Sequence, residues 1–295
     1  MHDHEAPVVI LATAAAYAEL SPDDRHFAAA LERRGLTARS GVWDDPSVDW
    51  TVTSVVVRST WDYFLRPTEF LAWAARVSAG TLLQNPLPAI AWNAHKGYLA
   101  ALQRRGFSII ETTFARHGET VDLAALARAR RWGDVVIKPA ISAAAHETRH
   151  FSAAQQSAAQ SHLDRLLASG DVMVQPHFAP LAASGELSVI FIGEEVSHGV
   201  RRRSALSNDD RGPEAQSETP PPDACRFAER VLESALGDIG ESMRLQPLLY
   251  ARVDIAERTA GDWVLLEIEL IEPSLFFRYA PRAAEQMADV LLRRL

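Results

Sequence analysis

Short apolar runs alternate with amphipathic stretches over the first ninety residues of the chain. Apolar runs with the character of strands lie at residues 7–13, 36–38, 42–43, 53–58 and 81–83. Between them, residues 22–34 and 67–78 have helical spacing, and Ser21 is placed to cap the first helix. The run at 53–58 is β-branched, as in a buried parallel strand. This alternation predicts a small α/β domain of the βαβ type over residues 1–90.

The rest of the chain mixes helices with strands that follow one another closely. Helical spacing predicts helices over residues 96–105, 123–131, 155–168, 224–236 and 281–294. Further strands are expected at 109–114, 135–138, 172–175, 186–192, 196–200, 248–255 and 263–270. Residues 204–223 are polar and contain three consecutive prolines, which predicts a long loop. The pattern is that of an α+β body joined to the α/β domain.

Charge and cysteine content narrow the class of protein. The 295 residues are 47% apolar, which is enough for one large or two to three small lobes. With 30 Lys+Arg against 38 Asp+Glu, the net charge of −8 argues against general binding of nucleic acid or anionic membranes. Cys225 is the sole cysteine, which excludes a disulfide framework and a thiolate zinc site. We therefore expect no nucleic-acid partner.

The N-terminal apolar stretch needs separate interpretation. Residues 8–18 resemble the core of a secretory signal, but no Lys or Arg precedes them, so residues 8–11 are interpreted as a first buried strand. No segment reaches 18 uninterrupted apolar residues, so we expect no membrane span. A cytoplasmic location fits both observations and the single cysteine. The sequence does not fix the oligomeric state, and we allow for a homodimer.

The strongest local signal is a pair of strands with alternating charged residues. Arg252 and Asp254 share one strand face, and so do Glu267 and Glu269, while apolar residues occupy the opposite face. A two-residue turn at 260–261 would place Asp254 opposite Glu267 and Arg252 opposite Glu269. Three converging carboxylates repel one another unless neutralised, and their hard oxygens favour Mg²⁺ or Mn²⁺. The alternative is a solvated sheet face with one ion pair.

Two lysines precede small or helical segments that suit an anion. Lys138 ends an apolar strand before the small residues 140–145, whose backbone N–H groups can approach a phosphate. Lys96 lies at an expected helix start, where anions are also favoured. Taken singly, each lysine is also typical of an ordinary snorkelling side chain.

Three consecutive arginines, Arg201, Arg202 and Arg203, follow the strand at 196–200. They cannot all share one face, yet at least one can meet a transferring phosphoryl group, whose oxygens match a planar guanidinium. The alternative is a solvated cluster of charge.

The order of these elements resembles the ATP-grasp superfamily, in the branch with glutathione-synthetase-like and RimK-like domains. A lysine at the start of a helix is followed by a strand that ends in Lys-Pro and then by a bend that contains Gln-Pro. Next come a hairpin that begins with Gly-Glu and ends in arginine, and two strands that contain Arg-x-Asp and Glu-x-Glu. More narrowly, the chain is similar to the group that contains O-ureido-serine cyclo-ligase, which closes the cycloserine ring. The strings that carry this resemblance are 59–63 (STWDY), 85–86, 92–96, 174–176, 185–186, 197–198, 250–254 and 267–274.

The resemblance implies a fold, a division into lobes and a set of site residues. It implies an N-terminal preATP-grasp-like α/β domain at 1–90 and two α+β lobes at 91–178 and 179–295, which grip a nucleotide. ATP would be held by Lys96, Lys138, Gln175, Pro176, His177, Phe178 and Glu186. Mg²⁺, or Mn²⁺ in its place, would be held by Asp254, Glu267 and Glu269. Phosphoryl transfer would be assisted by Arg201, Arg203 and Arg252. A small amino-acid-like substrate would meet Trp61, Asp62, Tyr63 and Ser274.

The implied activity is ATP-dependent C–N bond formation through an acyl phosphate, in the sharpest version as ring closure on O-ureido-serine. Two alternatives remain open: an intermolecular ligase of carboxylates and amines, and a nucleotide-binding protein without turnover. The second is motivated by residues 142–145, SAAA, which stand where relatives carry glycines. Alanine lacks the freedom of glycine at positive φ, so this loop either avoids left-handed conformations or closes poorly on phosphate.

Overall fold

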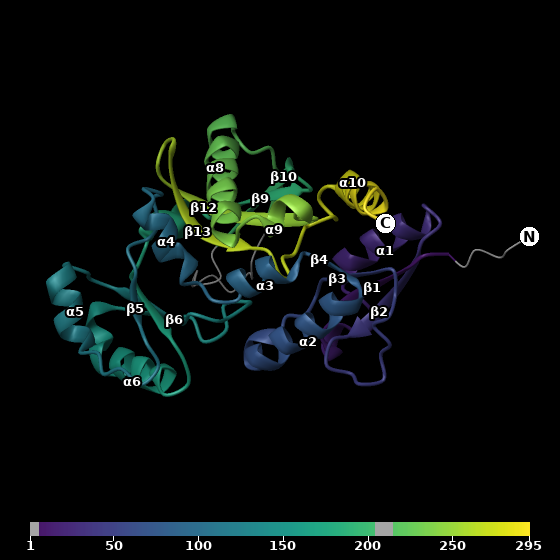
Figure 1. The fold of residues 1–295 in the computed structure, drawn as a ribbon. Coiled ribbons are helices and arrows are strands. Elements are labelled where there is room, and N and C mark those ends of the chain that lie inside the picture. The colour runs from purple at the N-terminus through teal and green to yellow at the C-terminus, as the bar shows by residue number, and fades with distance from the viewer. Residues whose placement is uncertain (1–5, 204–214) are drawn as a thin grey trace, which may run out of the picture.

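The N-terminal residues form a four-stranded parallel sheet with helices packed on it. The computed structural model describes residues 6–203 and 215–295, and it gives this sheet the order β2-β1-β3-β4 (Figure 1). Ser21 accepts a hydrogen bond from the Asp24 backbone N–H at 3.1 Å and caps the first long helix, as expected. The expected alternation of strands and helices is confirmed, with β1 (Val8–Thr13), β2 (Thr37–Val42), β3 (Ser54–Val57), β4 (Leu82–Gln84), α1 (Pro22–Glu32) and α2 (Pro67–Gly80).

A second, smaller sheet follows in the middle of the chain. Its order is β5-β8-β6-β7, and every pairing in it is antiparallel. Two amphipathic helices bury their apolar sides on it around Leu163 and Val174. The elements are β5 (Thr113–Ala115), α5 (Leu123–Arg130), β6 (Val135–Pro139), β7 (Arg149–Phe151), α6 (Gln156–Leu167) and β8 (Val172–Pro176).

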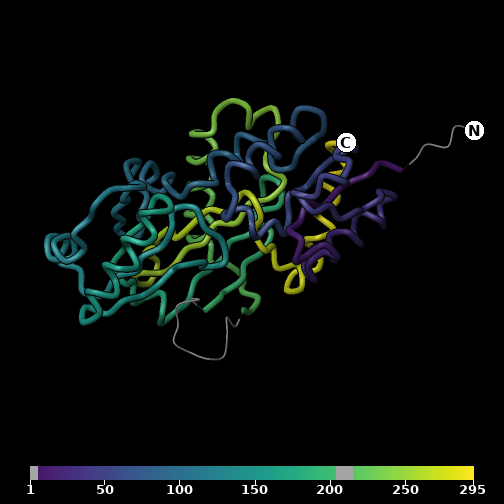
Figure 2. Tube along the Cα trace, turned by 90° about the horizontal axis from the view of Figure 1, so that it is seen from below, coloured from purple at the N-terminus to yellow at the C-terminus, as the bar shows by residue number. Residues whose placement is uncertain are grey.

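The third sheet carries the two charged strands and has the order β11-β10-β9-β12-β13. The long helix α8 (Pro222–Ile239) packs on it through an apolar stripe that includes Ala228 and Val231. Figure 2 shows strands of the small sheet beside the yellow strands β12 and β13. The strands are β9 (Glu186–Ile192), β10 (Glu195–Arg202), β11 (Ala215–Glu218), β12 (Tyr250–Thr259) and β13 (Asp262–Glu269).

Short helices join these bodies in ways that the order of the chain does not reveal. The helix α10 (Pro281–Leu292) lies against α1 of the N-terminal domain, and one apolar core includes both together with β9 (Figure 1). The helix α4 (Tyr98–Arg104), from the range assigned to the small lobe, packs against α8 of the large sheet. Three further short helices are α3 (Leu87–Asn93), α7 (Ala179–Ser184) and α9 (Ser242–Leu245).

Several expected boundaries differ from the structure. The helix expected from residue 96 begins at Tyr98, because residues 94–97 form turns. The strand expected at 109–114 is the short β5, and before it only Ile109 bridges to Leu265. The loop expected over 204–223 contains β11 and the start of α8, while residues 204–214 lie outside the described part. No helix in the described residues is long and apolar enough to cross a membrane.

Candidate active site

The charged faces of β12 and β13 meet in the register that the sequence predicts. Asp254 lies opposite Glu267 and Arg252 opposite Glu269, across a turn at residues 260–261. Each strand carries one bulge, and the two bulges offset each other, so the register of a simple two-residue turn is restored. All four charged side chains therefore occupy one face of the sheet.

Basic side chains hold most carboxylates of this face. Arg252 donates to Asp254 at 2.9 Å and also to Glu269. Its guanidinium carbon lies over the Phe276 ring, 5.6 Å from the ring centroid. Burial alone would raise the pKa of Asp254, but Arg252 and Arg202 outweigh it and hold that pKa below its usual value. Burial raises the pKa of Glu269 to about 7, although Arg252 opposes the shift. The face is thus a dense network of opposite charges.

Strand β9 extends this network with two further side chains. The Ser188 hydroxyl donates to Asp254 at 2.6 Å. Glu186 pairs with Arg202 at 2.6 Å, and the same guanidinium reaches Asp254 at 3.2 Å. Burial raises the pKa of Glu186 to about 7, against the opposing charge of Arg202. Arg202 therefore bridges two carboxylates at the heart of the site.

A bulge in β10 decides which arginine faces the acids. Up to Val196 the hairpin pairs residues as its turn requires, but from His198 onward the register is shifted by one residue. A one-residue shift exchanges the two faces of a strand. Arg202 consequently lies opposite Glu186, whereas Arg201 makes a two-point ion pair with Glu218 at 2.6 and 2.7 Å. Of the arginines selected from the sequence, the structure brings Arg252 to the acids and turns Arg201 to the other side.

The two lysines lie beside Glu267 in different states. Lys96 is 6% exposed, and its ammonium contacts Glu267 at 2.9 Å and the Ser142 carbonyl at 2.7 Å. Burial would lower the pKa of Lys96, but Glu267 outweighs it and raises that pKa. Burial lowers the pKa of Lys138, and Glu267 offsets this only in part. Within residues 6–203 and 215–295, Lys138 forms no ion pair. Its ammonium is therefore available to an anionic ligand.

One pocket collects residues from the small sheet and from the acidic face. The segment Gln175–Phe178 lines it together with Lys138, and Glu186, Asp254 and Glu267 form its acidic wall. Ile110, Val136, Leu181 and Leu266 add apolar surface. Strands from both lobes therefore place a lysine, a backbone segment and carboxylates around one space, although these residues are up to 129 positions apart in the chain.

The donor set suits a divalent cation carried by an anionic ligand. Asp254 and Glu267 line the same pocket, and Glu269 shares their face. Over the described part of the chain, no three His, Cys, Asp or Glu side chains already stand around one point. Arginine and lysine currently hold these oxygens, as expected for carboxylates that would otherwise repel one another. Oxygen donors of this kind are those that Mg²⁺ prefers.

The residues expected to contact the substrate do not all lie at the acidic face. Trp61 donates its indole N–H to the Glu272 carbonyl at 2.8 Å, and Arg252 donates to the Ser274 carbonyl at 3.2 Å. Burial raises the pKa of Tyr63 well above its usual value, and Glu272 raises it further. The two hydrogen bonds place Trp61 and Ser274 at the edge of the acidic face, whereas Tyr63 packs on Phe70 and lies within electrostatic range of Glu272.

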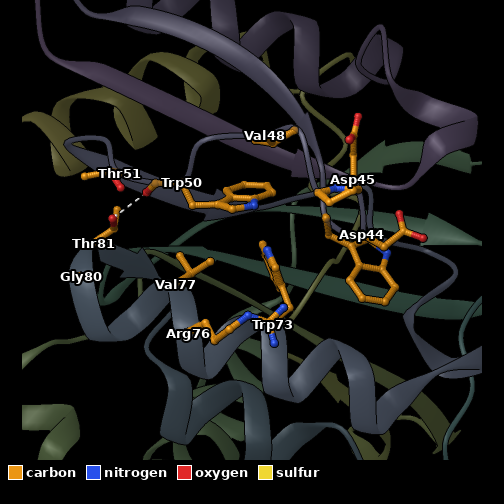
Figure 3. Close-up of a pocket in the computed structure, with 12 residues that line it drawn as sticks. Asp44, Asp45, Val48, Trp50, Thr51, Trp73, Arg76, Val77, Gly80 and Thr81 are labelled. Carbon is orange, nitrogen blue, oxygen red and sulfur yellow. Dashed lines mark hydrogen bonds between the residues drawn. The ribbon is translucent and has the colours of Figure 1, made fainter.

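Asp62 points elsewhere, because it accepts a hydrogen bond from the Trp43 indole at 2.8 Å. Trp43 lines a separate cavity of about 430 Å³ in the N-terminal domain, with Trp50 and Trp73 (Figure 3). The residues that line this cavity come from the segment after β2 and from α2 to its C-terminal end, and none belongs to the acidic face. Asp62 is therefore not brought to the site with its neighbours.

The alanine-rich loop adopts the conformations that glycine usually supplies. Ala144 and Ala145 have φ of +50° and +54°, and backbone hydrogen bonds of 3.0 Å from His146 to Ala143 and from Thr148 to Ala145 close the turns. Left-handed backbone costs a non-glycine residue about 1 kcal/mol or more. The His146 ring packs on Phe64 at 4.8 Å, so the loop reaches the N-terminal domain. Of the two alternatives stated for this loop, the one in which it avoids left-handed conformations is wrong.

Comparison with known proteins identifies relatives of the whole chain. The model of the D-cycloserine synthetase DcsG N-terminal domain matches residues 9–85. The cycloserine biosynthesis protein DcsG of Streptomyces lavendulae is 31% identical over 274 residues, covering 88% of this chain and 90% of that protein. This chain belongs to the DcsG family. The crystal structure of D-cycloserine synthetase DcsG superposes with a TM-score of 0.89 at 29% identity, covering 97% of this chain and 99% of that one.

Structures of more distant proteins identify the fold of this DcsG family member. The ATP-grasp ligase PsnB, in complex with its minimal precursor, has a TM-score of 0.63 at 17% identity and covers 99% of this chain and 100% of its own. D-alanine–D-alanine ligase from Bacillus anthracis has a TM-score of 0.70 at 11% identity and covers 98% and 97%. The ATP-grasp fold expected from the order of the motifs is confirmed, and membership of the DcsG family agrees with the expected class of ligase.

Two residues of this DcsG family member were not selected from the sequence. Arg202 was passed over in favour of its neighbours, because the bulge that turns it inward leaves no signal in the hairpin sequence. Glu272 was noted only as part of a motif, yet its side chain is 7% exposed beside the acidic face. The signal available for Glu272 was its place three residues after Glu269, directly before a proline.

Proposed function

We propose that this chain is an ATP-dependent ligase that closes a ring within an amino-acid substrate, as in the conversion of O-ureido-serine to cycloserine. The observation that carries the proposal is the pocket in which Lys138 and Gln175–Phe178 of the small lobe face Asp254 and Glu267 of the large lobe. A phosphate-binding group, a backbone edge and a set of hard oxygens in one space suit a metal-bound nucleotide.

In this proposal the nucleotide lies between the lobes. Residues 175–178 present backbone groups to the base, and the unpaired ammonium of Lys138 meets the phosphates. Lys96 and Glu186 complete the phosphate end, since Lys96 contacts Glu267 and Glu186 lines the pocket. A desolvated, half-buried lysine without an ion-pair partner is unfavourable in the free protein, which argues for a ligand of opposite charge.

Asp254, Glu267 and Glu269 would hold Mg²⁺, with Mn²⁺ as an alternative for the same oxygen donors. When bound, the ion supplies Lewis-acid neutralisation of the phosphate oxygens. PsnB has been solved with Mg and ADP, at 17% identity to this chain. The Arg252 and Arg202 guanidiniums, which now hold these carboxylates, are placed to meet anionic oxygens nearby.

The proposed reaction has two balanced steps. A substrate carboxylate oxygen attacks the γ-phosphorus of ATP, so that an acyl phosphate forms and ADP leaves. A nitrogen of the same molecule then attacks the acyl carbon, phosphate leaves, and the nitrogen loses one proton. With O-ureido-serine the ring nitrogen still carries its carbamoyl group, and hydrolysis of that group by one water to carbon dioxide and ammonia leaves cycloserine. Both reactants of the first step are anions, so positive side chains must offset their repulsion, and Arg252, Arg202, Lys96 and Lys138 surround the place where they meet.

Exclusion of water is the remaining requirement, because an acyl phosphate hydrolyses readily. Residues 140–148 are suited to it, since His146 packs on Phe64 and the Ser142 carbonyl accepts from Lys96. This loop thus joins the phosphate end of the pocket to the N-terminal domain. We include Trp61 and Ser274 in the substrate site on the hydrogen bonds that bring them to the acidic face, and Tyr63 because it lies within electrostatic range of Glu272.

The test is release of ADP with Mg²⁺ and O-ureido-serine, alongside a panel of amino acids, with products identified by mass spectrometry. Stoichiometric ADP and a cyclic product support the proposal. A linear conjugate of two substrates would instead identify an intermolecular ligase. Tight ATP binding with no ADP release for any substrate would refute ligase activity and leave a nucleotide-binding protein.

A further inference from the structure

The acidic face contains one carboxylate without a cation. Asp254 is paired with Arg252 and Arg202, Glu267 with Lys96, and Glu269 with Arg252. Glu272 is 7% exposed, so it is nearly as buried as Asp254 and more deeply buried than Glu267 and Glu269. Among the residues that the structure describes, no other residue donates a hydrogen bond to its carboxylate or forms an ion pair with it, and only its own backbone N–H interacts with it.

An ionised carboxylate that is buried without a cation destabilises the folded protein. A buried charge without a partner is strongly destabilising and is usually retained for a ligand or a function. Burial and the neighbouring charge of Glu269 raise the pKa of Glu272 to about 8, and Lys96 opposes this only partly. A cation supplied from outside the chain would restore the balance and keep Glu272 ionised at neutral pH.

The surroundings of Glu272 define the kind of cation. Trp61 donates its indole N–H to the Glu272 carbonyl at 2.8 Å, and the Tyr17 ring stands edge-on to Trp61 at 4.6 Å. Tyr63 is close enough for Glu272 to raise the pKa of its hydroxyl. The main chain of Glu272 is thus held by an aromatic side chain, and a carboxylate near aromatic rings can recognise an alkylammonium through charge and ring faces together.

The position of Glu272 also orients a ligand. Glu267 lines the nucleotide pocket, whereas Glu272 does not. Lys96 forms an ion pair with Glu267, and the charge of Glu272 also raises the pKa of Lys96. Two residues further on, the Ser274 carbonyl accepts from Arg252 at 3.2 Å. A zwitterion whose ammonium lies at Glu272 can therefore direct its carboxylate toward Arg252 and the phosphate end of the pocket.

We propose that Glu272 binds the α-ammonium group of the amino-acid substrate, with Trp61 and Tyr63 as the aromatic walls of that subsite. This assignment rests on the ligase function proposed above and adds how the substrate is recognised. It requires the substrate to carry a free amino group, and it predicts selection of an amino acid over the corresponding simple carboxylic acid.

The test compares O-ureido-serine with 3-(ureidooxy)propanoate, the same molecule without its α-amino group. In the wild type we expect KM to be at least about tenfold higher for the deamino compound, since a charge-assisted buried contact is lost. Glu272→Gln should raise KM for O-ureido-serine by a similar factor and leave KM for the deamino compound within about threefold. KM for ATP should be unchanged.

Glu257→Gln is the matched control, because Glu257 lies on β12 but bonds only to the turn, through the Gly261 N–H at 2.7 Å. Equal loss with both substrates in Glu272→Gln, or a raised KM for ATP, would overturn the assignment and place Glu272 with the metal or nucleotide. If Glu272→Gln fails to fold, Glu272→Asp and the wild-type preference still decide, since a wild type that does not discriminate also overturns it. Absence of ADP release in the wild type would remove both proposals at once.

Discussion

The two lysines of the site should affect stability in opposite directions when each is replaced by methionine. Lys96 is buried and Lys138 half-buried beside Glu267, but only Lys96 pairs with it, at 2.9 Å. Lys96→Met leaves Glu267 without its partner, which should cost about 2–3 kcal/mol, at the low end for a buried pair because Glu267 is partly exposed. Lys138→Met breaks no ion pair and removes a desolvated charge, so stability should stay equal or rise.

Both variants should bind ATP more weakly. Loss of one charged contact to phosphate corresponds to about 1.5–3 kcal/mol, or roughly ten- to a hundredfold in Kd. The expected Tm of Lys96→Met is lower than that of the wild type by about 5 °C or more, whereas that of Lys138→Met is not lower. Calorimetric binding of a non-hydrolysable ATP analogue and thermal unfolding at pH 7 measure the two effects separately.

The pH dependence of Tm independently checks the sign of each lysine's contribution to stability. Burial lowers the folded-state pKa of Lys138 below 10.5, so its penalty is full at neutral pH and fades as pH rises toward 10.5. The advantage of Lys138→Met over the wild type should therefore shrink between pH 7 and 10. The folded-state pKa of Lys96 is raised above 10.5, so its contribution persists at pH 10 and the deficit of Lys96→Met remains. Equal Tm losses in both variants, or unchanged ATP affinity in Lys138→Met, would refute this reasoning.

Three further predictions concern the acidic face and the loop. Glu267→Gln should abolish Mg²⁺-dependent ADP release, because it removes an oxygen donor from the pocket wall. Arg202→Ala should lower kcat by at least about a hundredfold, whereas Arg201→Ala, on the opposite face, should change it less than about threefold. Ala145→Gly should not lower Tm, because φ of +54° favours glycine, while Ala140→Gly, at a buried position without positive φ, should lower it by a few degrees.

Each of these outcomes has a clear opposite. Magnesium-dependent turnover in Glu267→Gln, measured by coupled ADP assay, would remove that carboxylate from the metal site. Loss of activity in Arg201→Ala with retention in Arg202→Ala would mean that the register of β10 is not as described. A lower Tm for Ala145→Gly than for Ala140→Gly in scanning calorimetry would contradict the left-handed loop.

The sequence alone determined the elements whose signal is local or periodic. The parallel N-terminal strands follow from β-branched runs between amphipathic helices, and the Ser21 cap follows from residue type and position. The facing of Arg252, Asp254, Glu267 and Glu269 was also predictable, since strand alternation and a two-residue turn fix one register. The order of these motifs along the chain was enough for the superfamily.

Only the tertiary structure decided the features that depend on contacts between distant segments. The bulge in β10 exchanged Arg201 for Arg202, because one extra residue reverses the faces of a strand and has no composition of its own. The packing of α10 on α1 joins residues about 250 positions apart, and helix periodicity names the apolar side of a helix but not its partner. Glu272 stood out only when every neighbouring carboxylate had been matched to its cation, since burial and pairing are properties of the folded chain.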